Sequence, residues 1–163
     1  MSRSKWVETD KMRLILALLT WENQLAIEVS LRYGLRIGDI LNFKTEQVRK
    51  GLFSLREEKT GKRRRVKLAP SLQADLLSIA GKVYVFENRL DWKKHRTRQA
   101  VYKDIKRASK ALRLAGCISC HSARKVYAVD KYERTGHNLK KVQELLNHSD
   151  EAVTMIYALA DKL

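Results

Sequence analysis

The sequence is poor in the features that disorder a chain or send it out of the cell. It has one proline, Pro70, and two cysteines among 163 residues, and its apolar residues form no long run. So little proline favours a compact, largely helical protein over a disordered or fibrous one. The polar start of the chain, residues 1–11, lacks the apolar stretch of a secretory signal. We therefore expect a cytoplasmic protein with no membrane partner, in which Cys117 and Cys120 are reduced thiols.

Acidic residues are also scarce. There are 18 Asp and Glu residues and 34 Lys and Arg residues, which gives a formal net charge of +16. Half of the basic residues lie in two stretches, residues 56–67 and 89–113. A charge surplus of this size repels itself unless an anionic partner offsets it, and its clustering indicates a binding face. The pattern favours nucleic acid as the partner.

The apolar spacing predicts a single domain over residues 1–163 that is mainly α with one small antiparallel β-hairpin, an α+β fold. The hairpin is expected within residues 47–68, with its turn at residues 59–62. Gly34 and Gly116 are expected to end helices, because a residue without a side chain most easily adopts the left-handed conformation. We expect a short strand at residues 83–86 and helices at about residues 12–19, 21–34, 37–41, 70–80, 99–115, 121–135, 139–146 and 151–159.

Several short motifs follow one another along the chain. Residues 33–41 read Tyr-Gly-Leu-Arg-Ile-Gly-Asp-Ile-Leu, and a Lys-Thr-Gly turn at residues 59–61 comes next. A His-x-x-Arg motif at residues 121–124 is followed by a histidine nine residues before a tyrosine. In this order, and over about residues 21–161, they resemble the motifs of tyrosine recombinases and phage integrases. The resemblance gives six catalytic positions: Arg36, Lys59, His121, Arg124, His148 and Tyr157.

The resemblance implies the catalytic-domain fold of that family and the activity of a site-specific DNA recombinase. Such an enzyme cleaves and rejoins double-stranded DNA through a 3′ phosphotyrosyl intermediate, with no metal and no nucleotide cofactor. Four protomers would exchange strands through a Holliday junction, and we expect a monomer without DNA. We expect no N-terminal core-binding or arm-binding domain in this chain. Two departures bear on the subgroup: Ser122-Ala123 replaces the more usual acidic residue and leucine, and Asn147 stands where glycine is common.

The expected roles follow from the negative charge that develops on a phosphodiester under attack. Arg36 and Arg124 are expected to hold the phosphoryl oxygens, because a guanidinium stays charged and offers a planar fork of donors. His148 is expected to donate a further hydrogen bond there. Asp39 matches an acidic position of the family and is expected to orient Arg36 without reacting.

Two proton transfers accompany the attack. Tyr157 has a hydroxyl that is a poor nucleophile at neutral pH, so its proton must leave as it attacks, and His121 is the expected base. Lys59 is expected to protonate the departing 5′ oxygen, with Lys62 as the competing acid.

The two basic stretches supply the expected DNA contacts outside the catalytic group. Phosphate contacts position a protein on DNA without specifying a sequence, so we expect binding of modest specificity that weakens steeply with salt. The expected contacts are Lys62, Arg63, Arg64, Arg65, Lys93, Lys94, Arg96 and Arg98.

Other functions fit parts of the sequence. Residues 139–157 also match a helix-turn-helix, which would make the protein a non-catalytic DNA-binding regulator with Tyr157 in its core. A type IB topoisomerase or a telomere resolvase would share the chemistry but not the biology. The Cys117-x-x-Cys120-His121 segment matches a haem-attachment pattern, but such attachment goes with export, and the His-x-x-Arg motif already accounts for the histidine. A zinc site lacks further ligands at a usual spacing, so we expect no metal.

Overall fold

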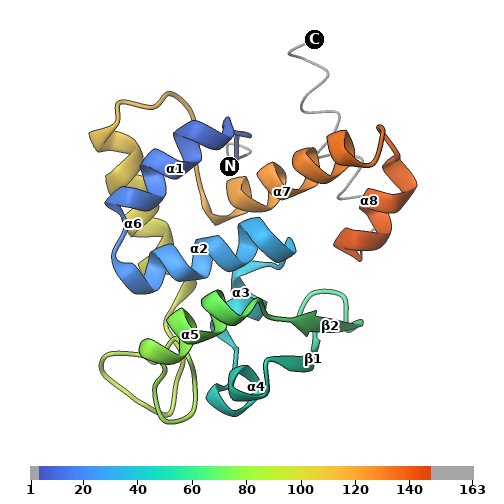
Figure 1. The fold of residues 1–163 in the computed structure, drawn as a ribbon. Coiled ribbons are helices and arrows are strands. Elements are labelled where there is room, and N and C mark those ends of the chain that lie inside the picture. The colour runs from blue at the N-terminus through green and yellow to red at the C-terminus, as the bar shows by residue number, and fades with distance from the viewer. Residues whose placement is uncertain (1–3, 148–163) are drawn as a thin grey trace.

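The computed structural model describes residues 4–147, a mainly helical fold with one two-stranded antiparallel sheet. In Figure 1 α2 runs through the middle, with α7 above it, α1 and α6 to one side, and α4, α5 and the sheet below it. The mainly α fold with a small hairpin, expected from the sequence, is confirmed. The elements are α1 (Thr9–Leu18), α2 (Trp21–Tyr33), α3 (Ile37–Leu41), α4 (Thr45–Lys50), β1 (Leu52–Arg56), β2 (Arg63–Lys67), α5 (Pro70–Ser78), α6 (Arg98–Ala111), α7 (Cys120–Arg134) and α8 (Leu139–Leu146).

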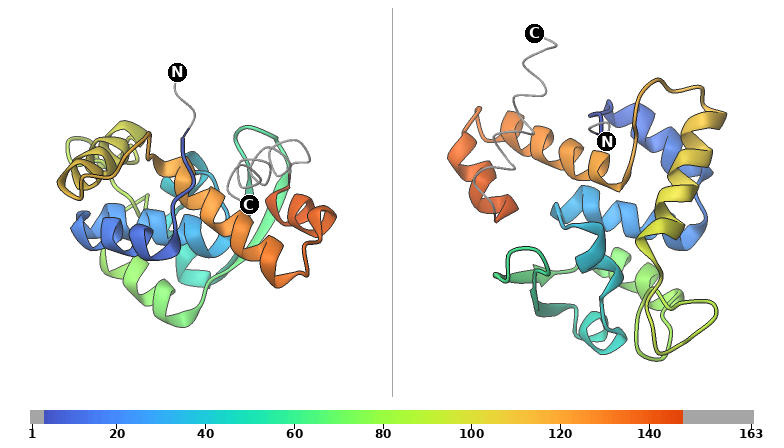
Figure 2. Two further views of the ribbon diagram at one scale, coloured as in Figure 1. Left: turned by 90° about the horizontal axis from the view of Figure 1, so that it is seen from above. Right: turned by 180° about the vertical axis from the view of Figure 1, so that it is seen from behind.

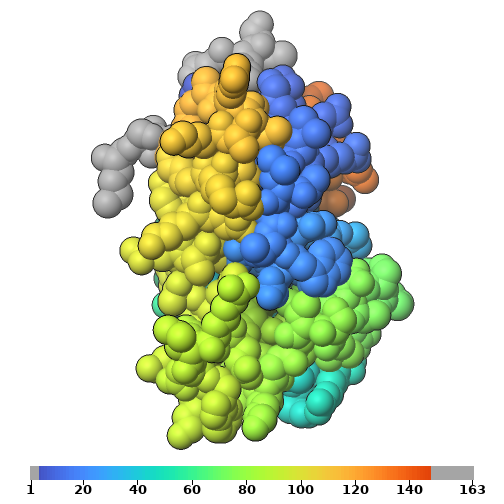
Figure 3. All heavy atoms as spheres, turned by 90° about the vertical axis from the view of Figure 1, so that its left-hand side faces the viewer, coloured from blue at the N-terminus to red at the C-terminus, as the bar shows by residue number. Residues whose placement is uncertain are grey.

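The core is built around α2, whose apolar residues Leu25, Ala26, Ile27 and Val29 are all buried. A helix that is apolar on most sides is stable only when neighbours cover it, and α2 packs against α1, α3 and α7. Figure 2 shows the two flanks of this centre, with α1 and α6 on one side and α8 and the hairpin on the other. In Figure 3 the atoms of α6 lie directly against those of α1. Within residues 4–147 no helix combines the length and the apolar character needed to cross a membrane.

The end of α2 is set by Gly34, which has a φ of 63° in the left-handed region. A Cβ at this position would lie 2.4 Å from the ring of Tyr127 on α7. Glycine is therefore needed both for the backbone conformation and for the close approach of α7. The turn that it makes buries Leu35 and places Arg36 directly before α3.

The hairpin pairs β1 with β2 in a register that runs from Leu52 opposite Lys67 to Arg56 opposite Arg63. Side chains alternate between the two faces, so Phe53 and Val66 are buried while the residues beside them in the strands point outward. The turn begins at Glu57, whose backbone N–H donates to the carbonyl of Lys62 over 2.9 Å. The hairpin expected within residues 47–68 is confirmed.

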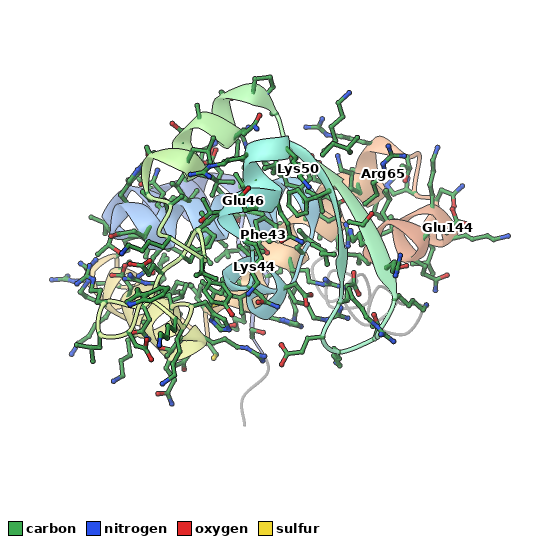
Figure 4. The ribbon with its side chains drawn as sticks, turned by 90° about the horizontal axis from the view of Figure 1, so that it is seen from below. Phe43, Lys44, Glu46, Lys50, Arg65 and Glu144 are labelled. Carbon is green, nitrogen blue, oxygen red and sulfur yellow. The ribbon has the colours of Figure 1, made fainter. Side chains whose placement is uncertain are left out.

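Two local predictions were wrong, and one helix was missed. The missed helix is α4, whose ends are set by capping and not by an apolar pattern: the Gln47 side chain accepts from the Lys44 amide over 3.0 Å, and Gly51 is left-handed. Residues 83–86 form no strand and contribute only an isolated bridge between Lys44 and Tyr84. Figure 4 labels Phe43 and Lys44, the two residues that precede α4.

The second wrong prediction concerns α6, which was expected to continue to a stop at Gly116. It ends at Ala111, and Arg113 already has a φ of 52°. Leu112 and Leu114 pack on the core from this turn. The other helices expected between residues 12 and 146 are confirmed within a few residues, and the one expected at 151–159 lies outside the described residues.

Candidate active site

A pocket of about 420 Å³ opens where α3, the hairpin turn and the start of α7 meet. Arg36, Lys59, His121 and Arg124, four of the six positions expected to be catalytic, all line it. They come from three separate segments of the chain, the residue before α3, the hairpin turn and the first turns of α7, and only the fold brings them together. The remaining lining residues are Leu35, Ile37, Gly38, Asp39, Glu58, Arg98 and Cys120.

Arg36 lies at the N-cap position of α3, and its side chain is only 11% exposed. Its Nη1 donates to Oε2 of Glu57 over 3.0 Å. The Glu57 side chain is fully buried, so this ion pair is shielded from water on the carboxylate side. A buried charge pair is screened much less than one on the surface, and the guanidinium is therefore held in a defined orientation.

Arg124 lies on α7 and is almost completely buried, at 1% exposure. Its Nη1 donates to the carbonyl of Gly34 over 2.7 Å, and its Nη2 donates to the carbonyl of Leu146 over 3.1 Å. These carbonyls end α2 and α8, where the last helical C=O groups lack helical partners. Arg124 thus satisfies two helix ends, which fixes the position of its guanidinium beside the pocket.

His121 is exposed in the first turn of α7. Its backbone N–H donates to the hydroxyl of the N-cap residue Ser119 over 3.2 Å. The positive end of the α7 dipole and this histidine therefore face the same pocket, an environment that suits an anion. Burial raises the pKa of the neighbouring Cys120 thiol to about 11, so this cysteine is protonated at neutral pH.

The two candidate acids in the hairpin turn occupy different places. Lys59 is exposed and lines the pocket. The Nζ of Lys62 instead donates to the carbonyl of Asn147 over 3.2 Å, at the left-handed residue that ends α8. Position therefore favours Lys59 as the acid, while Lys62 joins the hairpin to the end of α8.

Asp39 is buried and lines the pocket. Its Oδ1 accepts from the backbone N–H of Glu58 over 2.9 Å, which fastens α3 to the hairpin turn. The carboxylate that hydrogen-bonds to Arg36 is Glu57, and Asp39 is close enough for the charge of Arg36 to act on its pKa, so the orientation of Arg36 by Asp39 stays a prediction. Burial raises the pKa of Asp39, and the carboxylate of Glu57 adds to that increase.

Glu57 is the site residue that the sequence reading missed. A signal was present: in β1 the inward positions alternate through Phe53 and Leu55, and Glu57 is the next in that series. Because Glu57 lies in a strongly basic stretch, residues 56–67, the sequence alone suggests a charged side chain on the surface.

The expected DNA contacts fall into two groups. Lys62, Arg63, Arg65, Lys93, Lys94 and Arg98 are exposed, and Arg98 also reaches the pocket, where it pairs with Glu58 at 2.5 Å. The other two, Arg64 and Arg96, are only partly exposed, and their role as DNA contacts stays a prediction. Arg64 is 15% exposed, pairs with Glu57 at 3.5 Å and donates to the carbonyl of Tyr33, because strand alternation turns it inward. Arg96 is half-buried, and burial lowers the pKa of its guanidinium.

His148 and Tyr157 lie outside the described residues, so the structure says nothing of their placement. The last described residues are held by two hydrogen bonds, in which the carbonyl of Leu146 accepts from Arg124 and that of Asn147 accepts from Lys62. Among residues 4–147, the His, Cys, Asp and Glu side chains form no group of three or more that could hold a metal ion. Cys117 and Cys120 are both free thiols.

Comparison with known proteins places this pocket in a family. The profile of the phage integrase family matches residues 5–163. The probable integrase/recombinase YoeC of Bacillus subtilis (strain 168) is 31% identical over 135 residues, which cover 79% of this chain and 72% of that protein. A protein named tyrosine recombinase from Thermosipho africanus (strain TCF52B) is 32% identical over 160 residues, which cover 91% of this chain but only 54% of that protein.

Solved structures share the fold at lower sequence identity. A lambda integrase(75-356) dimer bound to a COC′ core site gives a TM-score of 0.74 at 22% identity, covering 95% of this chain and 60% of that one. The lambda integrase catalytic core gives a TM-score of 0.70 at 20% identity, covering 88% of this chain and 91% of that one. The XerA recombinase gives a TM-score of 0.69 at 20% identity, covering 96% of this chain and 61% of that one. At these identities the likeness concerns the fold alone.

Proposed function

This chain belongs to the phage integrase family, and from that premise we propose that it carries the catalytic machinery of a tyrosine-type site-specific recombinase, with Tyr157 as the nucleophile. The observation that carries the proposal is the convergence of Arg36, Lys59, His121 and Arg124 on one pocket. A DNA-binding regulator has no need for such a convergence.

In the proposed reaction the Tyr157 oxygen attacks the scissile phosphorus while its proton passes to His121. A phosphorus–oxygen bond to tyrosine forms as the bond to the 5′ oxygen breaks, and Lys59 gives that oxygen its proton. The product is a 3′ phosphotyrosyl bond and a free 5′ hydroxyl. Because the new bond retains the energy of the old one, a 5′ hydroxyl from another strand reverses the step without a nucleotide cofactor.

The arginines supply the charge that stabilises this transition state. Arg36 is held by Glu57 and Arg124 by two helix-end carbonyls, so neither has to reorganise when the phosphoryl oxygens gain charge. Fixed donors of this kind are typically worth about a hundredfold to a thousandfold each in rate. His148 supplies a further hydrogen bond in this proposal, and no metal is required.

The proposed partner is double-stranded DNA, with four protomers assembling on it from monomers. One structure of the same fold is a lambda integrase tetramer bound to a Holliday junction, with a TM-score of 0.75 at 20% identity. The exposed basic residues of the hairpin and of residues 93–98 are suited to phosphate contacts.

The test is covalent capture of DNA. The full chain is incubated with a pool of nicked duplexes of random sequence, in excess chelator, and the protein-linked fraction is isolated and mapped. We expect an adduct at Tyr157 that Tyr157→Phe abolishes without loss of DNA binding. The control is Tyr132→Phe, which changes a half-buried tyrosine of α7 outside the pocket and should leave the adduct intact.

Each alternative has its own outcome in the same assay. Binding without any adduct supports the helix-turn-helix regulator and sinks the proposal. Adduct formation with relaxation of supercoils, but without resolution of a synthetic Holliday junction, supports the topoisomerase.

A further inference from the structure

Glu57 is a fully buried carboxylate in a basic part of the molecule, with 0% of its side chain exposed. Removing an ionised carboxylate from water costs several kcal/mol unless charged or hydrogen-bonding partners replace the water. It occurs at the end of β1, on the inward face that also carries Phe53. An apolar residue at this inward position would pack at no such cost. The burial of Glu57 therefore depends on the groups that hydrogen-bond to its carboxylate.

Three segments meet at this carboxylate. Oε2 accepts from Nη1 of Arg36 over 3.0 Å and from the hydroxyl of Thr60 over 2.8 Å. Oε1 lies 3.5 Å from Nη1 of Arg64, which also donates to the backbone carbonyl of Tyr33. The carboxylate therefore joins the start of α3, the hairpin turn and β2.

The backbone of Glu57 is itself fixed by the turn. Its N–H donates to the carbonyl of Lys62 over 2.9 Å, and its carbonyl accepts from the N–H of Gly61 over 2.8 Å. Thr60, which donates to the carboxylate, directly follows Lys59. One side chain thus fixes the arginine on α3 relative to the turn that carries the lysine.

We propose that Glu57 is a positioning residue that aligns Arg36 with the scissile phosphate and sets the distance from it to Lys59. This inference rests on the proposed function. A carboxylate that binds a guanidinium fixes the position and orientation of its charge, and a misplacement of about 1 Å in an active site can cost about a hundredfold in rate. The anion also offsets the mutual repulsion of the cations gathered here.

The experiment compares Glu57→Gln with Glu46→Gln on two substrates. Glu46 also pairs with an arginine, Arg49, at 2.7 Å, but on the exposed surface of α4, where Figure 4 labels it. One substrate carries a normal phosphodiester at the captured cleavage position, and the other carries a methylphosphonate there. The methyl group removes the charge of the phosphate, so the demand for an aligned arginine falls.

We expect Glu57→Gln to lower single-turnover cleavage of the phosphodiester by about tenfold to a hundredfold. Cleavage of the methylphosphonate should fall only a few-fold, and Glu46→Gln should match wild type on both. The ratio of the two rates does not depend on how much of the protein is folded, because both rates scale with that fraction. A purely structural role for Glu57 would leave the ratio unchanged and overturn the inference.

If Glu57→Gln yields no folded protein, Glu57→Asp takes its place, since it keeps the charge but retracts it by one methylene. Its ratio should shift in the same direction by a smaller factor, and a ratio equal to that of wild type overturns the inference. The proposed function fails separately, by the absence of a Tyr157 adduct in the wild-type protein.

Discussion

Arginine serves two different purposes in two regions of this molecule. In the pocket Arg36 and Arg124 are nearly buried, and each is bound to fixed partners. On the outer face of β2, Arg63 and Arg65 are exposed. Figure 4 labels Arg65, which lies on β2.

The two groups of arginines differ in when their side chains lose conformational entropy. The pocket arginines lose their side-chain freedom when the protein folds, so none of it remains to be lost in a transition state. The exposed arginines keep theirs in the folded protein and would lose it only on binding an anionic partner. In the proposed function we therefore expect the first group to govern rate and the second to govern affinity.

The sharpest way to break this comparison is Arg124→Lys. A lysine cannot bridge the carbonyls of Gly34 and Leu146, and it offers no planar fork to phosphate. We expect cleavage to fall by about a hundredfold to a thousandfold and Tm to decrease, measured by single-turnover adduct formation and thermal unfolding. Arg65→Lys on β2 is the matched control and should change both by little. Equal effects of the two changes would mean that burial does not separate these roles.

The lysines of the hairpin turn repeat the comparison on a smaller scale. Lys59→Ala should cleave normal DNA poorly, by about a hundredfold, and recover when the 5′ bridging oxygen is replaced by sulfur, a leaving group that needs no proton. Lys62→Ala should lose much less, and sulfur should not restore what it loses, because its amine binds the Asn147 carbonyl. Rescue of Lys62→Ala by sulfur instead would reassign the acid.

The exposed arginines should carry affinity and its salt dependence. Arg63→Gln combined with Arg65→Gln should reduce the slope of log K against log salt by up to about two, with cleavage at saturating DNA unchanged. Arg64→Gln, between them in the sequence, should leave the slope unchanged and lower Tm, because Arg64 pairs with buried Glu57. Titrations at several salt concentrations measure the slope; a reduced slope for Arg64→Gln would place that residue on the DNA face.

The smallest effect is expected from a change at Asp39, a buried acidic residue whose protonation affects stability. Burial raises the pKa of this carboxyl, so the folded protein holds its proton more tightly than the unfolded chain does. Its contribution to stability is therefore present at low pH and is lost as pH rises through the raised pKa. Asp39→Asn cannot titrate and can still accept from the Glu58 amide. The Tm of the variant minus that of wild type should rise by a few degrees from about pH 4 to pH 7. A constant difference would show that Asp39 does not titrate in this range.

Much of this could be read from the sequence. Apolar spacing located every described helix except α4, and the alternation around a Lys-Thr-Gly turn located the hairpin. Motif order identified Arg36, Lys59, His121 and Arg124, which the fold then brings into one pocket. The short α4 was missed because its existence depends on caps and packing more than on a pattern.

By itself the sequence determined which chemical groups are present, in what order, and with how large a surplus of positive charge. Only the tertiary structure decided which arginines are buried and which are exposed, because strands alternate faces and a shift of one residue reverses the role of a side chain. Arg63, Arg64 and Arg65 are identical as letters, yet the middle one joins Glu57 inside the fold. The partner of Arg36 was likewise decided by the hairpin, since Glu57 lies 21 residues away in the chain and 3.0 Å away in space.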